Sequence, residues 1–271
     1  MRAISTFNRV STDISEIQHR ITTGQRINSG KDDPGGLIIR EGLRADIKGI
    51  QATQANMTQA EILMDTASSG MMQLLELLRG SETNDPSNGG LIGELNGSLD
   101  YTGKKAVAEK FLELYDATVT KNTYNGDKLI GGDLAGTGKK TYQLGDGVGT
   151  LEVEIADLST IGAAAALKTA VGAIANDTTV TAAITAAEAL LKTIAAAAGT
   201  LGGSQKIAAT NQKLLDSRLT SVTASEGRIS NADIAVESSR MARAELLAQN
   251  AMNSIMYTRK YAAFAVSSLF G

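Results

Sequence analysis

The sequence has no cysteine, no tryptophan, two prolines and a single histidine in 271 residues. The lack of cysteine excludes disulfides, thiolate metal sites and a thiol nucleophile. Aromatic residues make up only 4% of the chain, which is unusual for a compact globular domain. The net charge of −3 is close to balance, so nothing indicates a nucleic-acid partner or an anionic membrane.

Long apolar runs are also missing. We see no span of about 20 apolar residues, so we expect no membrane partner. Residues 1–20 lack the apolar block of a cleavable signal. If the protein leaves the cell, we expect it to use a route other than the ordinary secretory one.

The residues that are present favour long helices with seven-residue repeats at both ends. Near the start, apolar residues at spacings of three and four predict a helix seam: Ala3, Phe7, Val10, Ile14, Ile17 and Ile21. A second helix is predicted from about residue 40 to about 79, with apolar residues every seven positions and Met57, Met64 and Met71 in its seam. The methionines favour core packing over an adaptable binding face.

The C-terminal 71 residues mirror this pattern. Apolar residues recur every seven positions from Leu201 to Ile229, the register then slips, and a new series runs from Ile234 through Met241, Ile255 and Leu269. The two ends are therefore predicted to coil together and against copies of themselves. The seam is rich in Ala and Thr rather than Leu, so we expect both ends to be largely disordered in the monomer and to order on assembly.

The middle of the chain reads differently. Residues 103–122 predict a shorter helix with Val107, Phe111 and Leu114 on one face. Residues 122–158 predict two small β-hairpins, the first turning at Asn125-Gly126 and the second carrying an alternating strand at Leu151 to Ile155. Residues 159–200 predict Ala-rich helices split near Asn176-Asp177, and this part is expected to be the outermost or most variable.

The break at residues 26–36, RINSGKDDPGG, is the main candidate for chemistry. A phosphate loop would need Ser or Thr after Lys31 and a preceding strand, and Asp32 with Asp33 lack a third metal ligand. The more favoured interpretation is that Asp33 caps the next helix with Pro34 at its first position. His19 is expected to be solvated on the polar side of the first helix. No catalytic set is found, so we expect neither an enzyme nor a cofactor or metal.

Three segments carry a resemblance to a known family. Residues 19–50 are similar to the N-terminal signature of bacterial flagellins at Asn28, Ser29, Lys31, Asp32, Asp33, Gly36 and Leu37. The segment TYNGDKLIGG resembles the family's Asn-Gly turn, and residues 229–235 resemble its C-terminal signature through Ile229, Ala232, Asp233, Ile234 and Ala235. The resemblance covers roughly 200 residues in the family's order, and this chain resembles a short member with reduced outer domains.

The resemblance implies a mainly α fold, a long helical hairpin or coiled-coil bundle with small β-hairpins in the middle. It implies an inner tube domain of residues 1–35 with 235–271, and a helical bundle domain of residues 36–234. It implies a subunit of the extracellular flagellar filament, a helical homopolymer, exported unfolded without a cleavable signal. The implied partners are copies of itself, an export chaperone and the export apparatus, and the filament cap and hook-associated proteins.

In this interpretation the break at residues 26–36 joins the inner helix to the outer bundle, and its charges contact neighbouring subunits. The predicted subunit-contact residues are Phe7, Val10, Ile14, Ile17, Ile21, Asn28, Lys31, Asp32, Asp33, Asp233, Met241, Ile255 and Leu269. The alternative is a hook–filament junction protein of the same superfamily, which would form short rings.

Overall fold

A computed structural model of the chain describes residues 2–80, 89–144 and 149–270, with side chains described outside residues 2–3, 137 and 262–270. Its helices and strands belong to two units. Unit 1 contains residues 1–48 and 218–271, and unit 2 contains residues 49–217. Two long helices, α2 (Pro34–Arg79) and α6 (Asp177–Ser230), contribute to both. The domain division predicted at residues 35 and 235 stays a prediction.

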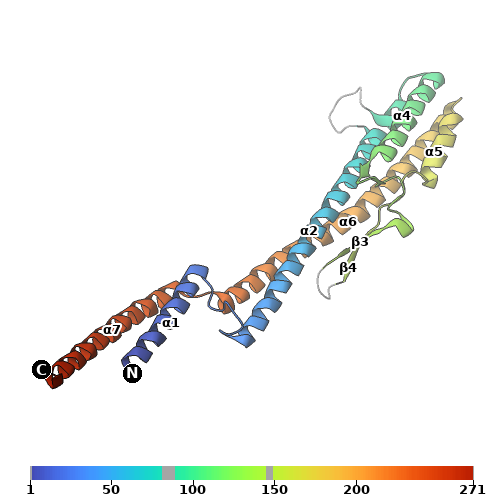
Figure 1. Ribbon diagram of the computed structural model, residues 1–271. Helices are drawn as coiled ribbons and strands as arrows, with labels where there is room; N and C mark the ends of the chain where they lie inside the picture. Colours follow the sequence, from blue (N-terminus) through green and yellow to red (C-terminus); the bar gives the residue numbers. More distant parts are fainter. Residues whose placement is uncertain (1, 81–88, 145–148, 271) are drawn as a thin grey trace. The chain divides into compact units, whose positions relative to one another are not determined.

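In unit 1, the first helix lies beside the last one (Figure 1). Helix α1 (Arg2–Thr23) and α7 (Ile234–Phe270) share a cluster with Val10, Ile17 and Ala244 buried at its centre. Partly buried residues packed against this centre are Ile14, Ile21, Met241 and Ala248. The predicted pairing of the two ends is therefore confirmed. The side chain of Leu269 lies outside the described residues.

The change of register in the C-terminal seven-residue repeats coincides with a break between two helices. Helix α6 ends at Ser230 and α7 begins at Ile234, so three residues separate two helices that the sequence alone could have joined. Asp233 explains the new start, because its side chain accepts hydrogen bonds from the backbone N–H groups of Ala235 and Val236. This is the arrangement of a helix N-cap.

Unit 2 is a bundle built on α2 and α6, with α4 and α5 beside them (Figure 1). The seam of α2 is fully buried, and the predicted methionine stripe is part of it: Met57, Ala60, Met64, Ala67, Met71, Leu74 and Leu78 each have 0% of their surface exposed. From α6, Ala187, Leu190 and Ile194 are equally buried. The interpretation of the methionines as core residues is confirmed.

The third predicted helix exists, but its predicted face is only partly right. Helix α4 runs Tyr101–Lys121 and begins with Asp100 as its cap. Its buried residues are Ala108, Phe111, Tyr115 and Val119, so Phe111 is buried as predicted, whereas Leu114 is 52% exposed. The predicted face did not include Tyr115. Its ring enters the core while its hydroxyl donates a 2.7 Å hydrogen bond to the carbonyl oxygen of Leu158, which satisfies the polar end.

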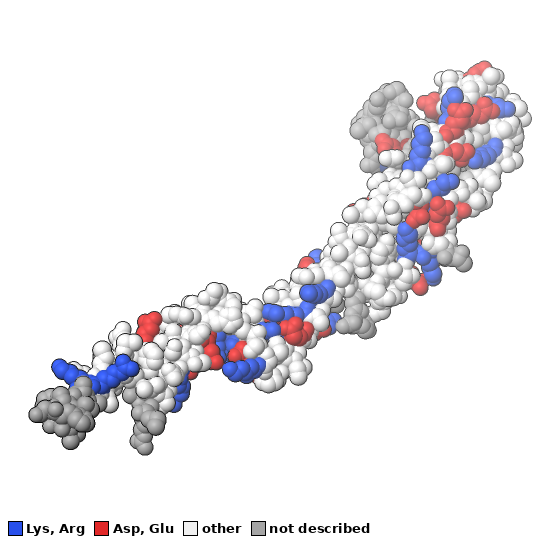
Figure 2. Space-filling view, in the orientation of Figure 1, with Lys and Arg blue, Asp and Glu red and all other residues white. Residues whose placement is uncertain are grey.

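Two further helices complete the end of unit 2. Helix α3 (Gly90–Asn96) was not predicted, and it buries Leu91 and Leu95. Helix α5 (Gly162–Gly172) precedes α6, which begins at Asp177 with Asn176 accepting from the N–H of Thr179, so the predicted split is confirmed. Charges of both signs lie side by side over α4 and α5 (Figure 2), and Lys168 of α5 pairs with Asp116 of α4 at 2.8 Å.

Both predicted hairpins are present. Strands β1 (Thr123–Tyr124) and β2 (Asp127–Lys128) are antiparallel and join at Asn125 and Gly126, whose φ angles of 52° and 91° are those of a tight hairpin turn. Strands β3 (Lys140–Gln143) and β4 (Thr150–Val153) pair with Tyr142 opposite Leu151. A short 3₁₀ helix, η1 (Gly136–Gly138), lies between the hairpins.

The second hairpin packs its alternating strand as expected. Leu151 and Val153 are buried, and Glu152 between them is exposed. An ion pair joins the two hairpins, since the Lys140 ammonium contacts the Asp127 carboxylate. The hairpins are thus fixed to each other as well as to the helices.

The expectation that the chain has no long apolar span is wrong. Among the described helices, α6 is long and apolar enough to cross a membrane, judged by length and composition alone. The prediction missed it because alanine raises the apolar content of a helix without large side chains, and α6 is rich in alanine.

Candidate functional site: the linker between the terminal helices

The candidate site lies in unit 1, where the chain leaves α1 and where it enters α7. We call residues 24–33 the N-linker and residues 231–233 the C-linker. The two pair through their backbones: the N–H of Arg26 donates to the carbonyl oxygen of Ser230 at 2.6 Å, and the N–H of Ala232 donates to that of Gly24 at 2.9 Å. Gln25 and Asn231 are the partners of this antiparallel bridge.

A side chain reinforces the bridge. The guanidinium of Arg26 donates to the carbonyl oxygen of Ile229 at 2.9 Å. That carbonyl belongs to the last turn of α6, whose final C=O groups have no partner inside the helix. Arg26 therefore caps the end of α6 from the N-linker.

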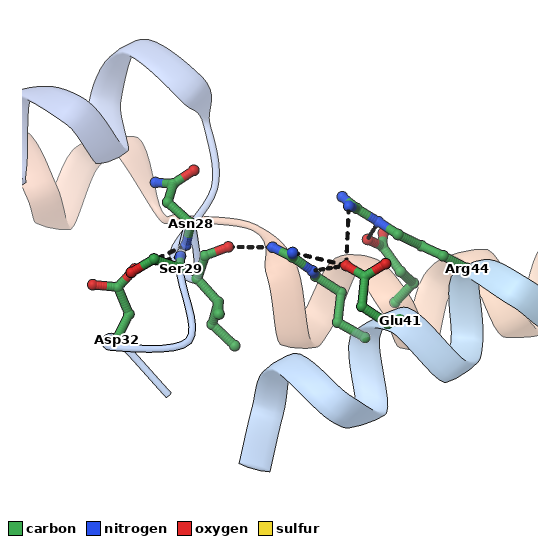
Figure 3. Close-up of polar contacts among 8 residues, drawn as sticks. Asn28, Ser29, Asp32, Glu41 and Arg44 are labelled. Carbon is green, nitrogen blue, oxygen red and sulfur yellow. Dashed lines mark hydrogen bonds and ion pairs between the residues drawn. The ribbon is translucent and has the colours of Figure 1, made fainter. Parts of the chain in front are cut away.

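Asn28 and Asp32 hold the N-linker in a tight turn (Figure 3). One Asp32 carboxylate oxygen accepts from the backbone N–H groups of Ser29 at 2.8 Å and Asn28 at 3.0 Å, and from the Ser29 hydroxyl. The hydrogen bond from the Ser29 N–H, followed by that from Asn28, lowers the pKa of Asp32. The Asn28 amide donates back to the Thr23 hydroxyl and the Gln25 carbonyl, which ties the turn to the end of α1.

Asp33 starts α2, as predicted from the Asp-Pro pair. Its carboxylate accepts from the N–H of Gly36 at 2.9 Å, and Pro34 is the first helical residue. A Cβ atom on Gly36 would lie 2.4 Å from the Asp33 carboxylate and 2.7 Å from the Ile27 side chain. The glycine at position 36 therefore allows the cap and the N-linker to approach the helix closely.

A network of charged residues connects the N-linker to α2 and α6, and two of its members, Glu41 and Arg44, are labelled in Figure 3. Arg40 is 6% exposed, and its guanidinium contacts the carbonyl oxygen of Ile27 and the carboxylate of Glu41. Arg44 continues the network, because it lies 3.6 Å from Glu41 and 3.0 Å from Glu226 of α6. Isolated surface pairs contribute little, but a network around a buried cation holds its members in one arrangement.

The start of α7 carries a buried carboxylate. Glu237 is 4% exposed, and one of its oxygens accepts from Arg240 at 2.8 Å. Within the described residues, its other oxygen is buried without a hydrogen-bond partner. Glu237 lies seven residues before Ala244, so it occupies a seam position of α7.

The predicted contact residues fall into two groups. Val10, Ile14, Ile17, Ile21 and Met241 lie in the seam between α1 and α7, and Phe7 and Ile255 are partly buried. Asn28, Asp32, Asp33 and Asp233 have their side chains engaged within the chain, in the linkers and caps. The Lys31 side chain is 86% exposed, and its ammonium pairs with Glu16 at 3.9 Å. Contact of these residues with another subunit stays a prediction.

Sequence reasoning missed Arg26, Arg40, Glu226 and Glu237. Nothing in the local pattern separates Arg40 or Glu226 from the charged residues of a solvated helix face. Only Glu237 carried a signal, since it falls on the seven-residue repeat of Ala244 and Ala251.

The site does not have the composition of a metal centre. Within the described part of the chain, no three His, Cys, Asp or Glu side chains come together in a way that could hold an ion. Asp32 and Asp33 point to different backbone segments, so the arrangement can hold helices in place rather than perform chemistry.

Two family models match this chain. The bacterial flagellin N-terminal helical region matches residues 1–134, and the bacterial flagellin C-terminal helical region matches residues 184–258. Together they include the N-linker, the C-linker and most of both paired helices. The chain belongs to the bacterial flagellin family. Flagellins are structural subunits of the extracellular flagellar filament, and these two matches place the chain among them.

Individual relatives agree with the family assignment. The chain is 27% identical over 233 residues to a flagellin of Halalkalibacterium halodurans, covering 85% of this chain and 82% of the relative. It is 26% identical over 153 residues to polar flagellin F of Vibrio parahaemolyticus, covering 55% of this chain and 38% of the relative. The chain thus spans well under half of that longer flagellin.

A solved structure has a similar fold. A structure assigned as a flagellar hook-associated protein from Vibrio parahaemolyticus matches with a TM-score of 0.58 at 13% identity, over 72% of this chain and all of that chain. At this identity the likeness concerns the fold alone.

Proposed function

We propose that the chain polymerises with copies of itself into a tubular flagellar filament through its terminal helices. In this proposal residues 1–35 and 235–271 form the inner tube. Residues 36–234 form the layer outside it, with the Ala-rich segment at residues 159–200 outermost. The family assignment supports a filament subunit, and the arrangement within the filament is our inference.

The observation that carries the proposal is the uncovered apolar surface of α7. Leu246 is 60% exposed, Met256 57%, Tyr257 63% and Tyr261 74%, although α1 already covers the seam of the same helix. Large apolar side chains gathered on one helix mark a surface that binds protein. Copies of the same chain can cover this surface, because a repeated head-to-tail contact that does not close builds an open helical polymer.

The N-linker supports the same proposal. Its backbone is fixed within the chain by Asp32 and Asp33, yet Lys31 stays exposed between the two ends of the turn. A charge held on an ordered loop can choose its partner at an interface, where ion pairs contribute more to specificity than to affinity.

We also propose partners other than the chain itself. In this proposal the chain is exported unfolded through the flagellar channel with the help of an export chaperone and the export apparatus. In the filament its ends would meet the cap and hook-associated proteins. We propose no catalytic role, no cofactor, and no nucleic-acid or membrane partner.

The first experiment is negative-stain microscopy of the purified chain after salting-out, beside a variant lacking residues 1–30. We expect long tubes of uniform diameter from the intact chain only. The variant loses all of α1 and with it Val10 and Ile17, so the inner wall cannot form.

Other outcomes decide between the alternatives. Short rings from the intact chain would favour a hook–filament junction protein. Tubes from both proteins would show that the N-terminal helix is not needed, and the proposed inner wall would be wrong.

A further inference from the structure

We propose that the backbone bridge between the N-linker and the C-linker sets the register in which α1 pairs with α7. The bridge joins Gly24 and Arg26 to Ala232 and Ser230. It concerns pairing within one chain, so it does not depend on whether the chain polymerises.

The seam between α1 and α7 does not by itself fix the register in which the two helices pair. Its residues repeat every seven positions, so a shift of seven places seam residues on seam residues again. If α7 moved so that later residues faced α1, Ala251 would replace Ala244 and Ala248 would replace Met241. Within the buried cluster the replacements are all apolar, and only the outer seam position of Ala251 receives a polar residue, Thr258, so the seam loses little.

A shift in the opposite direction would place Glu237 where Ala244 now lies, between Val10 and Ile17. Glu237 is already only 4% exposed in the natural register, and its partner Arg240 would move with it. This shift therefore exchanges one buried position of the carboxylate for another. The seam excludes neither shift, so something outside the seam must set the register.

The described charges do not take over this role. The ion pairs of these two helices run from Arg240 to Glu237 within α7, and from Lys31 of the N-linker to Glu16 of α1. The first stays unchanged when the helices slide past each other, and so does the second, since α1 carries both Glu16 and the N-linker.

The bridge has the geometry for the task. It begins one residue after α1 ends at Thr23, and it ends two residues before α7 begins at Ile234. A shift of seven residues moves one helix by roughly 10 Å at 1.5 Å per residue. So short a connection cannot absorb that distance while Gly24 and Ala232 remain hydrogen-bonded, so the bridge excludes a shift in either direction.

Cysteine crosslinking reads the register directly, because the natural chain has no cysteine. One cysteine replaces Ile14, and a second is placed in turn along α7. The second positions are Met241, Ala244, Ala248, Ala251 and Ile255. Each full-length variant is oxidised at high dilution in sucrose, which favours the folded state, and intrachain products are identified by mass spectrometry.

Disulfide formation distinguishes the natural register from a register shifted by seven residues. A disulfide needs Cα atoms within about 7 Å, so a partner displaced by seven residues does not form the same crosslink. With the natural linker we expect one dominant partner position on α7.

Two linker substitutions test the bridge from either side. Ala232→Pro removes the N–H that donates to Gly24, and Arg26→Pro removes the N–H that donates to Ser230. The matched control is Ile234→Pro, since a proline at the first helical position removes an N–H that the helix does not use.

We expect both bridge variants to give a second product, seven residues away from the natural one along α7. The ratio of the two products should change by roughly fivefold or more with Ala232→Pro, as expected from losing one backbone hydrogen bond. The change should be larger with Arg26→Pro, which also removes the guanidinium hydrogen bond to the carbonyl oxygen of Ile229. The Ile234→Pro chain should keep the single natural product.

Three outcomes would overturn the proposal. If both bridge variants keep the natural partner at natural yield, the seam sets its own register. If they lose every crosslink, the linkers are needed for pairing itself and do not choose among registers. If the natural chain gives no crosslink at any position, the fixed pairing on which the inference stands is absent.

Discussion

Asp32 and Asp33 are adjacent in sequence, yet they stabilise different backbone segments. Asp32 holds the turn of the N-linker, and Asp33 caps α2. Because adjacent side chains leave the backbone in different directions, Asp32 can bind the N-linker while Asp33 binds the start of α2. The pair therefore resembles a site in sequence and acts as two separate anchors in structure.

Replacing Asp33 with alanine should weaken the first turn of α2. An N-cap of this kind contributes about 1 kcal/mol, so amide exchange at Gly36 should become roughly fivefold faster. Hydrogen exchange followed by NMR measures it. Asp46→Ala removes the same charge from an exposed position within α2 and is the control. Equal exchange in the two variants would mean that the cap is not used.

The turn held by Asp32 should depend on pH. Its pKa in the folded chain lies below the ordinary aspartate value of 3.8, because the N–H of Ser29 and then that of Asn28 donate to the carboxylate. The stabilisation is therefore complete above about pH 4 and is lost as pH falls through the lowered pKa. The amide shifts of Asn28 and Ser29 should report a midpoint below 3.8.

Asp32→Asn supplies the control for that titration. Its amide has no proton to gain in this range, so the two amide shifts should lose their pH dependence. A midpoint at or above 3.8 in the natural chain would contradict the lowered pKa.

The structural roles of some residues could be predicted from the sequence, and those of others could not. The cap at Asp33 was predictable because Asp-Pro has one low-energy use at a helix start. Arg40 was not, since its burial results from the N-linker folding back so that the carbonyl of Ile27 meets the guanidinium. That contact depends on chain geometry thirteen residues away, and no local pattern encodes it.

The helices of the two units differ in how firmly they are packed. In unit 2 the fully buried seam of α2 contains three methionines and two leucines besides Ala60 and Ala67. In unit 1 the seam of α7 is built largely from alanine at positions 244, 248 and 251. Each missing methylene forgoes about 0.8 kcal/mol of burial, so α1 and α7 gain far less from pairing.

We therefore expect α1 and α7 to exchange quickly in a dilute monomer. Hydrogen exchange with mass spectrometry should find them nearly unprotected, while residues 49–79 of α2 and 177–217 of α6 stay protected. In polymer both sets should be protected. Strong protection of α1 and α7 at high dilution would show that the alanine seam is sufficient by itself.

The positions of the helices could be predicted from the sequence more easily than the side of each helix that is buried. The seven-residue repeats placed α1, α2 and α7 because many positions agree with one period. In helix α4 the apolar residues surround much of the helix, so they do not mark one face, and the predicted face omitted Tyr115. Helix α3 is only seven residues long, too short to show a period at all.

At the scale of the whole molecule, a substitution at Lys31 tests the proposed contact between subunits. Its side chain is 86% exposed, so reversing its charge should leave the folded chain intact. We expect Lys31→Glu to raise the protein concentration needed for polymerisation, and the effect to shrink at high salt as the Debye length shortens. Sedimentation of polymer at several salt concentrations measures both.

Lys192→Glu is the matched control, because Lys192 is exposed in the Ala-rich segment that we place outermost. It makes the same charge change and should polymerise like the natural chain. If the two variants behave alike, Lys31 has no specific partner in the polymer.

The family signatures and the paired ends could be predicted for the chain as a whole, since they rest on residues spread over both ends. The bridge between the linkers could not. It is made by backbone atoms, whose hydrogen bonds leave no trace in side-chain identity, and its strands are a single residue pair long.

That bridge also bears on the order of events when the chain folds. Arg26 and Ile229, which meet across it, are 203 residues apart in sequence. Closing so long a loop in an unfolded chain costs entropy that one residue pair cannot repay. Folding of unit 2 beforehand would tether the intervening chain and shorten the effective loop. We therefore expect the bridge to be a late contact, absent from the folding nucleus, so that its loss speeds unfolding and leaves the folding rate of unit 2 unchanged.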